Sequence, residues 1–308
     1  MTDYRHGWYA LAFERDLVEP ISPLTFGGRS LMAVRSGRGI RILDARCPHR
    51  GANLAFGGRL AGASLICPFH GHRIGLGQAS EDAFAVREYA ALVHGGVVFA
   101  RLSDIDNIDQ PDLPGALSAF GVGHTFVPGF ELTAHTSIEM VMENGFDSSH
   151  FRAVHRLVNV PRLEIGTGPW QELKATGRFE IPRSAWHEPS GAGGTQLGAR
   201  YYAHAFSPGV VVTELDGDPP FRYKVMTTAT PTADGAASTV RLTLILPDMP
   251  DGAPPDPRFV EDLLAASRSG LELDCQIWDR LDIGLPPQLT ENDNAVTAFA
   301  EFCRPFRA

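Results

Sequence analysis

Two short segments of the chain each pair a cysteine with a histidine. The segment CPHRGANL contains Cys47 and His49, and the segment CPFHGH contains Cys67 and His70. Each pair stands between a strand-like segment and a glycine, so each can form the tip of a tight loop. Two such loops facing each other would bring two thiolates and two imidazoles together, which is a metal-binding set.

Two kinds of metal centre can use this set of ligands. Zinc accepts two cysteines and two histidines, but zinc fingers usually keep the cysteines in one pair and the histidines in the other. Here each loop supplies one ligand of each type. This division suits a [2Fe–2S] cluster in which two cysteines hold one iron and two histidines hold the other. Because imidazole is neutral, such a cluster has a higher reduction potential than an all-cysteine cluster.

A further group of metal-binding residue types stands in the stretch MENGFDSSHFRAVH. Asn144, Asp147 and His150 follow one another at intervals of three, so they share one face of a regular helix. His155 comes five positions after His150 and would point away from that face. Both imidazoles can reach one metal only if the helix is distorted. We therefore expect a π-bulge between them, since such bulges are frequent at functional sites.

Residues 47–70 resemble the cluster-binding motif of Rieske proteins, and the spacing from Asn144 to His155 is similar to the iron motif of Rieske non-heme iron oxygenases. Respiratory Rieske proteins carry two further cysteines that link the loops by a disulfide. Other residues stand in those places here, such as Phe69, so the chain resembles the oxygenase and ferredoxin branch. His72 departs from the oxygenases, which commonly have an aromatic residue there. We expect it to be a solvent-facing neighbour of the cluster.

The resemblance implies a mononuclear Fe(II) centre held by two histidines and one carboxylate, a set that leaves positions for O2 and substrate. His150 and His155 would be the histidines. The segment LELDCQIWDRL resembles the family segment in which an acidic residue is followed one turn later by an aromatic or aliphatic one. Asp274, with Trp278 after it, is therefore the expected carboxylate. The alternatives are Glu272, Asp279, Asp282 and Asp293.

The resemblance also gives roles to two polar residues of the second motif. In the family, the aspartate that matches Asp147 bridges the iron-binding histidine, here His150, to a cluster histidine, here His70, of the neighbouring subunit. Such a carboxylate orients both imidazoles and gives electrons a short route. Head-to-tail contacts of this kind imply a closed homotrimer. Asn144 is expected near the iron without being a firm ligand.

The remaining histidines and cysteines are expected to be structural or surface residues. His204, in the segment ARYYAHAF, is the one that could face the substrate cavity. Cys275 and Cys303 are expected to pack as small apolar groups. The other histidines without a metal role are His6, His72, His94, His124, His135 and His187.

The elements that must position these residues change in pattern along the chain. Residues 1–117 are predicted to form an all-β Rieske domain of short strands and glycine turns, including a hairpin of 30–35 with 39–45 and a linker at about 103–117. Residues 118–308 are predicted to form a helix-grip catalytic domain, with an antiparallel sheet and helices near 138–156, 256–282 and 291–303. The predicted fold class is α+β.

Composition narrows the classes of function. The chain has 308 residues, 44% of them hydrophobic, with 32 Gly and 23 Pro, which fits an ordinary core and many turns. A formal net charge of −9 argues against nucleic acid as a partner, because phosphates need a basic face. The first residues lack the pattern of a signal peptide, and no apolar run is long enough for a membrane span. Four cysteines in such a chain suggest a reducing, cytoplasmic location.

Together, the motifs and the resemblance imply the terminal oxygenase of a Rieske non-heme iron system. The chain has no glycine-rich dinucleotide fingerprint, so electrons would come from a separate NAD(P)H-dependent reductase, with or without a ferredoxin. Hydroxylation or oxidative demethylation of a small, largely apolar organic substrate is expected, since the length favours monooxygenases. The alternatives are dihydroxylation of aromatic rings by the same centres, an electron-transfer Rieske protein without oxygenase activity, and a zinc-stabilised binding module.

Overall fold

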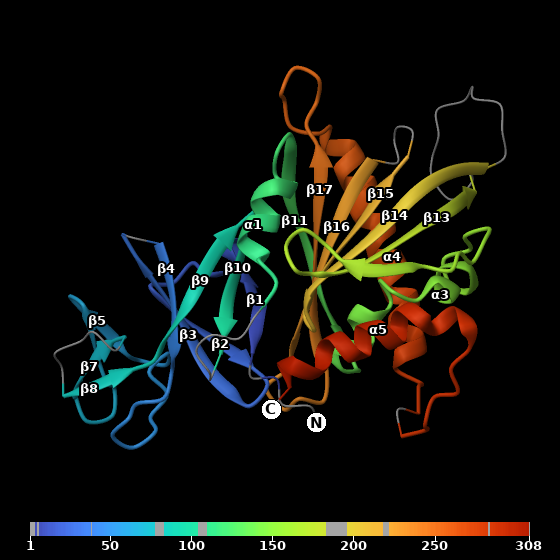
Figure 1. The fold of residues 1–308 in the computed structure, drawn as a ribbon. Coiled ribbons are helices and arrows are strands. Elements are labelled where there is room, and N and C mark those ends of the chain that lie inside the picture. The colour runs from blue at the N-terminus through green and yellow to red at the C-terminus, as the bar shows by residue number, and fades with distance from the viewer. Residues whose placement is uncertain are drawn as a thin grey trace.

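A computed structural model describes residue 4 and residues 6–37, 39–77, 83–103, 110–182, 196–217, 222–282 and 284–307. These residues form two modules that lie side by side, each built on a large β-sheet (Figure 1). In the part of the chain that the structure describes, no helix combines the length and apolar character needed to cross a bilayer. The predicted α+β class, with an all-β N-terminal module and a C-terminal module of antiparallel sheet and helices, is confirmed.

The N-terminal module has a six-stranded antiparallel sheet in the order β1-β10-β9-β4-β3-β2. The predicted hairpin is confirmed as β3 and β4, which pair from Leu31 with Asp44 to Ser36 with Gly39. The 3-10 turn η1 (Glu14–Asp16) follows the first strand. The strands are β1 (Gly7–Phe13), β2 (Ile21–Phe26), β3 (Arg29–Ser36), β4 (Gly39–Asp44), β9 (Glu88–His94) and β10 (Val97–Leu102).

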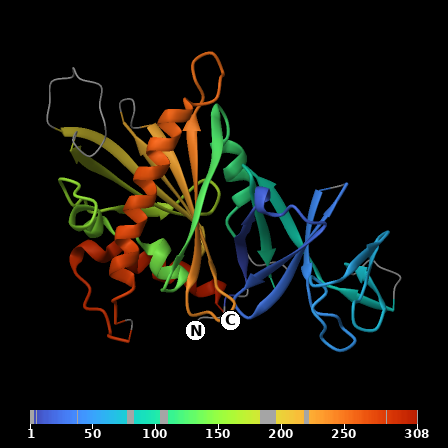
Figure 2. The same cartoon turned by 180° about the vertical axis from the view of Figure 1, so that it is seen from behind.

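A second, four-stranded sheet lies at the end of this module that is farthest from the C-terminal sheet (Figures 1 and 2). It contains β5 (Arg59–Ala61), β6 (Ser64–Ile66), β7 (Arg73–Leu76) and β8 (Phe84–Val86). Leu43, Leu54, Leu65 and Ile74 are fully buried in the core between the two sheets. The chain segments that carry the predicted cluster ligands enter and leave this small core.

The C-terminal module has a seven-stranded sheet in which all neighbours are antiparallel. The segments that alternate apolar and polar residues are its strands, because one face packs against α4 (Pro257–Trp278). Figure 2 shows this long helix running across the sheet. In chain order the strands are β11 (His124–Ala134), β12 (Glu164–Thr167), β13 (Leu173–Pro182), β14 (Gln196–Ser207), β15 (Val210–Asp216), β16 (Arg222–Pro231) and β17 (Ser238–Pro247).

The two modules share a buried apolar seam. Phe99 of the N-terminal sheet, Leu117 of α1 (Leu113–Phe120) and Met226 of the C-terminal sheet belong to one buried cluster. At the edge of the seam, Gly209 lets an aromatic ring approach, since a Cβ there would lie 2.7 Å from Cδ1 of Tyr9. The modules are therefore packed together over the sheet face that is opposite α4.

The predicted linker differs from the structure where the chain can be described. Residues 104–109 lie outside the described residues, but α1 is helical from Leu113. The carboxylate of Asp112 accepts a hydrogen bond from the N–H of Gly115, and Pro114 stands in the first turn, where no N–H is needed. These local signals start a helix, and burial of its apolar face in the seam stabilises it.

The single helix predicted near 138–156 is two short helices. Ser137 caps α2 (Ile138–Glu143) and Asp147 caps α3 (Ser148–Ala153) through side-chain oxygens. The residue types between them favour caps and turns over helix interior, and the chain turns at 144–146. The predicted C-terminal helix is confirmed as η3 (Glu291–Asp293) and α5 (Asn294–Cys303), followed by η4 (Arg304–Phe306).

Candidate functional site

The two cysteine–histidine pairs meet at the tip of the N-terminal module. Cys47 and Cys67 are buried, with 3% and 2% of their surface exposed, whereas His49 and His70 are exposed. The two imidazole rings lie 4.8 Å apart between centroids and are nearly perpendicular, at 75°. The four predicted ligands are therefore together, with the thiols on the protein side and the imidazoles on the solvent side.

The two loops repeat the same backbone pattern. The N–H of Gly51 donates to the carbonyl of Cys47 at 2.8 Å, and the N–H of Gly71 donates to the carbonyl of Cys67 at 3.0 Å. Both glycines have left-handed backbone, with φ of 73° and 70°, a conformation that side chains disfavour. Each loop thus folds its cysteine inward by local bonds alone, so the pair of loops is suited to hold a cluster between them.

The two thiols differ in their electrostatics. Burial raises the pKa of Cys67. Hydrogen bonds to its sulfur, among them those from the backbone N–H groups of Phe69 and His70, together outweigh this effect, so the pKa of Cys67 lies below its usual value. Burial dominates at Cys47, whose pKa is raised despite a bond from the N–H of His49. Backbone N–H groups that point at sulfur stabilise a thiolate and raise the potential of a bound cluster.

His72 is a neighbour of the cluster ligands, as the sequence predicts, and it is partly exposed. Its ring lies 4.4 Å from that of His49 and 5.2 Å from that of Phe84. Its carbonyl accepts the N–H of Cys67 at 2.9 Å. The loop turns back on itself after Gly71, which places the residue after it beside the opposite loop.

The second group of predicted ligands meets in the C-terminal module. Ligand atoms of His150, His155 and Asp274 all lie within 4.8 Å of one another. Nε2 of His155 is 3.2 Å from Oδ1 of Asp274, and the two imidazole rings are 5.1 Å apart between centroids at 84°. Two imidazoles and one carboxylate that converge from one side form a set that could hold a divalent transition metal.

The π-bulge that the sequence predicts between the histidines is wrong, although the helix is interrupted there. α3 ends at Ala153, and the N–H of Val154 donates to the carbonyl of His150 at 2.7 Å. His155 stands on the following turn, and Arg156 has a positive φ of 59°, which is uncommon for a residue with a side chain. Because the helix ends, His155 can turn toward His150, and no extra residue is inserted into the helical hydrogen-bond pattern.

The orientation of His150 is fixed by its backbone neighbour. Nδ1 of His150 lies 2.6 Å from the carbonyl oxygen of Asp147, so Nδ1 carries the proton and Nε2 keeps its lone pair. Burial lowers the pKa of His150, which favours the neutral, ligating form. The carboxylate of Asp147 instead caps α3, accepting the N–H groups of Ser149 and His150 at 2.8 and 3.1 Å. The link from Asp147 to the imidazole thus runs through the carbonyl and not the expected carboxylate.

Asp274 differs from its alternatives in burial. It is 7% exposed, whereas Glu272, Asp279 and Asp282 are exposed and Asp293 belongs to η3. A buried carboxylate is costly unless it is paired, and its partner here is His155. One turn earlier on α4, Gly270 lies beside the imidazole, and a Cβ there would make an ordinary contact with Cε1 of His155 at 3.7 Å. Asn144, the other polar residue of the motif, is the C-cap of α2.

A cavity of about 340 Å³ opens beside this group, with His155 and Asp274 in its wall. Its other lining residues are mostly apolar, and they come from the sheet, from α3 and from α4. Several polar groups in the wall are already bonded. The hydroxyl of Ser267 donates to the carbonyl of Leu263 at 2.7 Å, and that of Tyr201 donates to the carbonyl of Gly145 at 2.7 Å. The cavity is therefore suited to a largely apolar molecule.

His204 faces away from this cavity. It lies on the other face of the sheet, where Nδ1 is 2.9 Å from Oε1 of the fully buried Glu172 and the ring packs 5.6 Å from that of Phe120. Side chains alternate along β14, so the residue three positions after Tyr201 must point to the opposite side. Cys303 is buried and Cys275 half-buried, as expected of small packed groups, and His187 lies outside the described residues.

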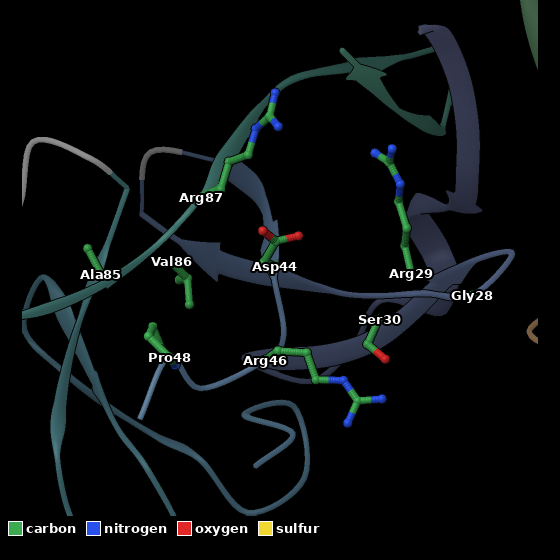
Figure 3. A pocket seen from close by; sticks show the side chains of 9 residues that line it. All are labelled: Gly28, Arg29, Ser30, Asp44, Arg46, Pro48, Ala85, Val86 and Arg87. Carbon is green, nitrogen blue, oxygen red and sulfur yellow. The ribbon is translucent and has the colours of Figure 1, made fainter. Parts of the chain in front are cut away.

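A second pocket, of about 320 Å³, lies beside the first cluster loop. Figure 3 shows Arg29, Arg46 and Arg87 around Asp44, with Pro48 of the loop at the near edge. Three guanidinium groups and one carboxylate give this pocket a positive balance in a chain whose formal net charge is −9. Sequence reasoning missed this pocket, because its arginines stand on separate strands and connections.

Sequence reasoning also missed most of the cavity wall. Phe151 stands inside the second motif, between the two histidines, and could have been found there. Tyr201, Leu215 and Tyr223 come from neighbouring strands of the sheet, and aromatic or aliphatic residues in strands carry no functional signal by themselves.

Comparisons with known proteins agree with this arrangement. Residues 7–87 match the model of the Rieske [2Fe-2S] domain, and residues 107–304 match that of the 3-ketosteroid 9alpha-hydroxylase C-terminal domain. Cholesterol 7-desaturase from Bombyx mori is 30% identical over 169 residues, which cover 49% of this chain and 36% of that protein. The oxygenase component of 3-ketosteroid-9-alpha-monooxygenase from Rhodococcus rhodochrous is 25% identical over 227 residues, or 69% of this chain and 56% of that protein.

The chain therefore spans only about a third to a little over half of the length of these relatives. Among solved structures, dicamba monooxygenase bound to dicamba is similar, with a TM-score of 0.73 and 18% sequence identity. That likeness covers 99% of this chain and 98% of the other, so both modules and their arrangement follow the same fold.

Proposed function

Because this chain belongs to the Rieske non-heme iron oxygenase family, we propose that it is the terminal oxygenase of such a system. It uses O2 and electrons from a separate protein to oxidise a largely apolar organic substrate. The observation that carries this proposal is the convergence of His150, His155 and Asp274 in the wall of the apolar cavity. An electron carrier would have no use for a ligand set that opens onto such a cavity.

Each module holds one metal centre in this proposal. In the N-terminal domain, residues 1–117, Cys47, His49, Cys67 and His70 hold a [2Fe–2S] cluster. In the catalytic domain, residues 118–308, His150, His155 and Asp274 hold Fe(II). Bound in that position, Fe(II) would supply the redox centre at which O2 is activated.

The residues of the chain itself prepare the second centre. The carbonyl of Asp147 holds His150 in the tautomer that presents Nε2, and Asp274 faces His155 at 3.2 Å. The apolar wall keeps bulk water from the reacting position and orients the substrate by shape. Asn144 stands at the end of α2, close in the chain to these ligands but without a ligand role.

Electrons pass between subunits of a homotrimer in this proposal. His70 is exposed at the tip of the N-terminal module, so its imidazole can contact a second copy of the chain. Asp147 of that copy would receive it, because its carboxylate is fixed at the start of α3, next to His150. Asp147 would then join the two imidazoles, His150 through its carbonyl and His70 of the neighbouring copy through its carboxylate, so the route is one residue long.

The substrate is proposed to be a small apolar compound that is hydroxylated or oxidatively demethylated. The bonded hydroxyls of Ser267 and Tyr201 leave the cavity wall with little to offer a polar ligand. Two relatives are named for steroids, 3-ketosteroid and cholesterol, and a similar structure holds dicamba. Fused apolar rings and small aromatic ethers are therefore the first two substrate classes to test.

The electron donor is proposed to be a separate reductase or ferredoxin with acidic side chains near its own redox centre. The pocket of Arg29, Arg46 and Arg87 lies next to Pro48, which follows the cluster ligand Cys47 (Figure 3). A carboxylate seated there would bring its carrier to the cluster. Opposite charges also speed the encounter of two redox proteins, in a way that salt weakens.

Two measurements test the proposed function. Iron analysis of the purified, loaded protein should give the two irons of the cluster and one more per chain, together with a Rieske spin-resonance signal. O2 uptake with a surrogate reductase should then depend on an added 3-ketosteroid or aryl methyl ether, and product mass gives the number of oxygen atoms inserted. Only two irons per chain, with no uptake, would favour the electron carrier. A colourless protein that contains zinc and no iron would contradict both the oxygenase and the electron-carrier function.

A further inference from the structure

Tyr201 contacts the second ligand motif at two points. Its hydroxyl donates to the carbonyl of Gly145 at 2.7 Å, in the turn between α2 and α3. Its ring lies 5.4 Å from that of Phe151, nearly perpendicular to it at 68°. Gly145 precedes His150 by five residues and Phe151 follows it directly, so these two contacts lie on either side of His150 in the sequence.

The turn that receives this hydroxyl is tightly packed on all sides. A Cβ at Gly145 would lie 3.2 Å from Cγ1 of Val211, so the turn rests directly on β15. The next residue, Phe146, is fully buried and stacks on Phe299 of α5, with 5.0 Å between the ring centroids. Because α2 ends here, the carbonyl of Gly145 lies past the last turn of the helix, and the hydroxyl of Tyr201 satisfies it.

Tyr201 itself is held rigidly in the sheet. It pairs with Gly177 on β13 and with Leu215 on β15, it is 3% exposed, and its ring packs 5.1 Å from that of Phe179. Burial raises the pKa of Tyr201, so its hydroxyl stays protonated and remains a donor. The same ring lines the cavity.

From this geometry we infer that Tyr201 is a positioning residue for the mononuclear metal site. Acting through Gly145 and Phe151, it fixes where α3 begins and hence where His150 points. Its ring is also part of the cavity wall, so a bound substrate would contact the same residue that orients His150. The inference rests on the proposed function, because it assumes that His150, His155 and Asp274 hold a metal.

The conservative variant Tyr201→Phe tests this inference, since it removes one hydroxyl and keeps the ring. Co(II), placed at the mononuclear site of the full-length protein whose cluster is oxidised and therefore silent in spin resonance, reports ligand geometry through its own spin-resonance spectrum. We expect the Tyr201→Phe protein to release Co(II) to a chelator about tenfold faster, because an unsatisfied buried carbonyl loosens the turn. The Co(II) spectrum should shift, while the spin-resonance signal of the reduced cluster stays unchanged.

Tyr202→Phe is the matched control, because it removes a hydroxyl from the next residue of the same strand, β14, whose ring lies on the other face of the sheet beside His204. This protein should keep the Co(II) release rate and spectrum of the unmodified chain. Unfolding is followed by calorimetry, and if Tyr201→Phe melts early, the release is measured at a temperature where the cluster's circular dichroism shows it folded.

Three results would overturn the inference. Unchanged release and spectrum in Tyr201→Phe would remove the positioning role and leave the proposed function intact. Equal shifts in both variants would mean a general effect of removing a tyrosine hydroxyl from β14. Failure of the unmodified, cluster-loaded protein to bind Co(II) at all would remove the metal site, and with it both this inference and the proposed oxygenase function.

Discussion

Nε2 of His155 lies 3.2 Å from Oδ1 of Asp274, although one residue follows α3 and the other stands about one turn before the end of α4. This contact brings together the two chain segments that must meet if one metal is to be held. Asp274 is buried, so the fold has already met the cost of bringing its carboxylate out of water. Protein contacts of its own therefore hold this part of the ligand set together.

Asp274→Ala should lose the mononuclear metal and keep the cluster. One of three converging ligands is removed, while the loops of Cys47 and Cys67 lie in the other module. Iron per chain should fall by one, with the red-brown colour unchanged and substrate-dependent O2 uptake abolished. Asp279→Ala, at the exposed C-cap of α4, is the control and should retain all iron. Full iron in Asp274→Ala would transfer the ligand role to another carboxylate.

Replacing Asp147 by two different residues should separate its two roles. Asn is as good an N-cap as Asp, so Asp147→Asn should keep α3 and both metals but slow electron transfer from cluster to iron, because the carboxylate charge that would receive the cluster histidine is gone. Asp147→Ala also loses the cap and should cost about 1 kcal/mol of stability. Single-turnover rates and denaturant unfolding measure the two effects. Equal single-turnover rates in Asp147→Asn and the unmodified chain would argue against the bridging role.

Gly71→Ala should damage the cluster site. Gly71 has a φ of 70° and no atom near its missing Cβ, so only backbone strain of about 1 kcal/mol opposes the change. Gly62 has a φ of 66° and equally open surroundings, which makes Gly62→Ala the matched control. Both proteins should lose similar stability, but only Gly71→Ala should retain less cluster iron after dialysis. Equal iron retention would mean that the loop tolerates the shift.

Reversing one charge of the basic pocket should weaken the electron donor's binding. In Arg46→Glu, the exposed guanidinium next to Cys47 becomes a carboxylate, and the apparent KM for an acidic donor should rise about tenfold at low salt. Added salt should shrink the difference. The same reversal at exposed Arg258 on α4 should change little. If the two variants behave alike, net charge and not the pocket is responsible.

The stability of the protein should fall as pH rises from about 4.5 to about 7, in part because of Glu143. Burial, followed by repulsion from Asp147, Glu139 and Asp293, raises the pKa of Glu143 from 4.5 to about 7. The folded state therefore holds this proton where the unfolded chain releases it, so the favourable contribution is complete below pH 4.5 and is lost by pH 7. Its size is of the order of 3 kcal/mol.

Glu143→Gln should remove this part of the pH dependence. Denaturant unfolding at pH 5 and pH 8 then gives two free energies that differ less than those of the unmodified chain. Glu261→Gln, on the exposed side of α4, is the control for a lost carboxylate. An unchanged pH dependence in Glu143→Gln would place the titrating group elsewhere.

The cluster loops could be predicted from the sequence because their structure is local. The Cys-Pro and His-Gly segments around Cys47 and Cys67 fold by bonds within each loop, and the order of residue types is enough to identify them. The strands from β13 to β17 could be predicted for a similar reason, since their alternation records one buried and one open face.

The second site depended more on tertiary structure. Spacing placed His150 and His155 in one motif, but the break after α2 and the early end of α3 depend on caps and on packing against β15. Asp274 was selected by resemblance, because nothing local distinguishes it from Asp279. Tyr201 had no signal, since the partner of its hydroxyl is a backbone carbonyl on a distant turn.

The seam between the modules has a consequence for protein engineering. The hydroxyl of Ser207 on β14 donates to the carbonyl of Trp8 on β1, and the ring of Tyr9 fills the space that Gly209 leaves open. β1 therefore contacts the C-terminal sheet as well as its own sheet. A chimera that exchanged only the N-terminal module would leave apolar residues of the C-terminal sheet without their packing partners. The graft must therefore also carry the matching residues of β14 and of the turn after it.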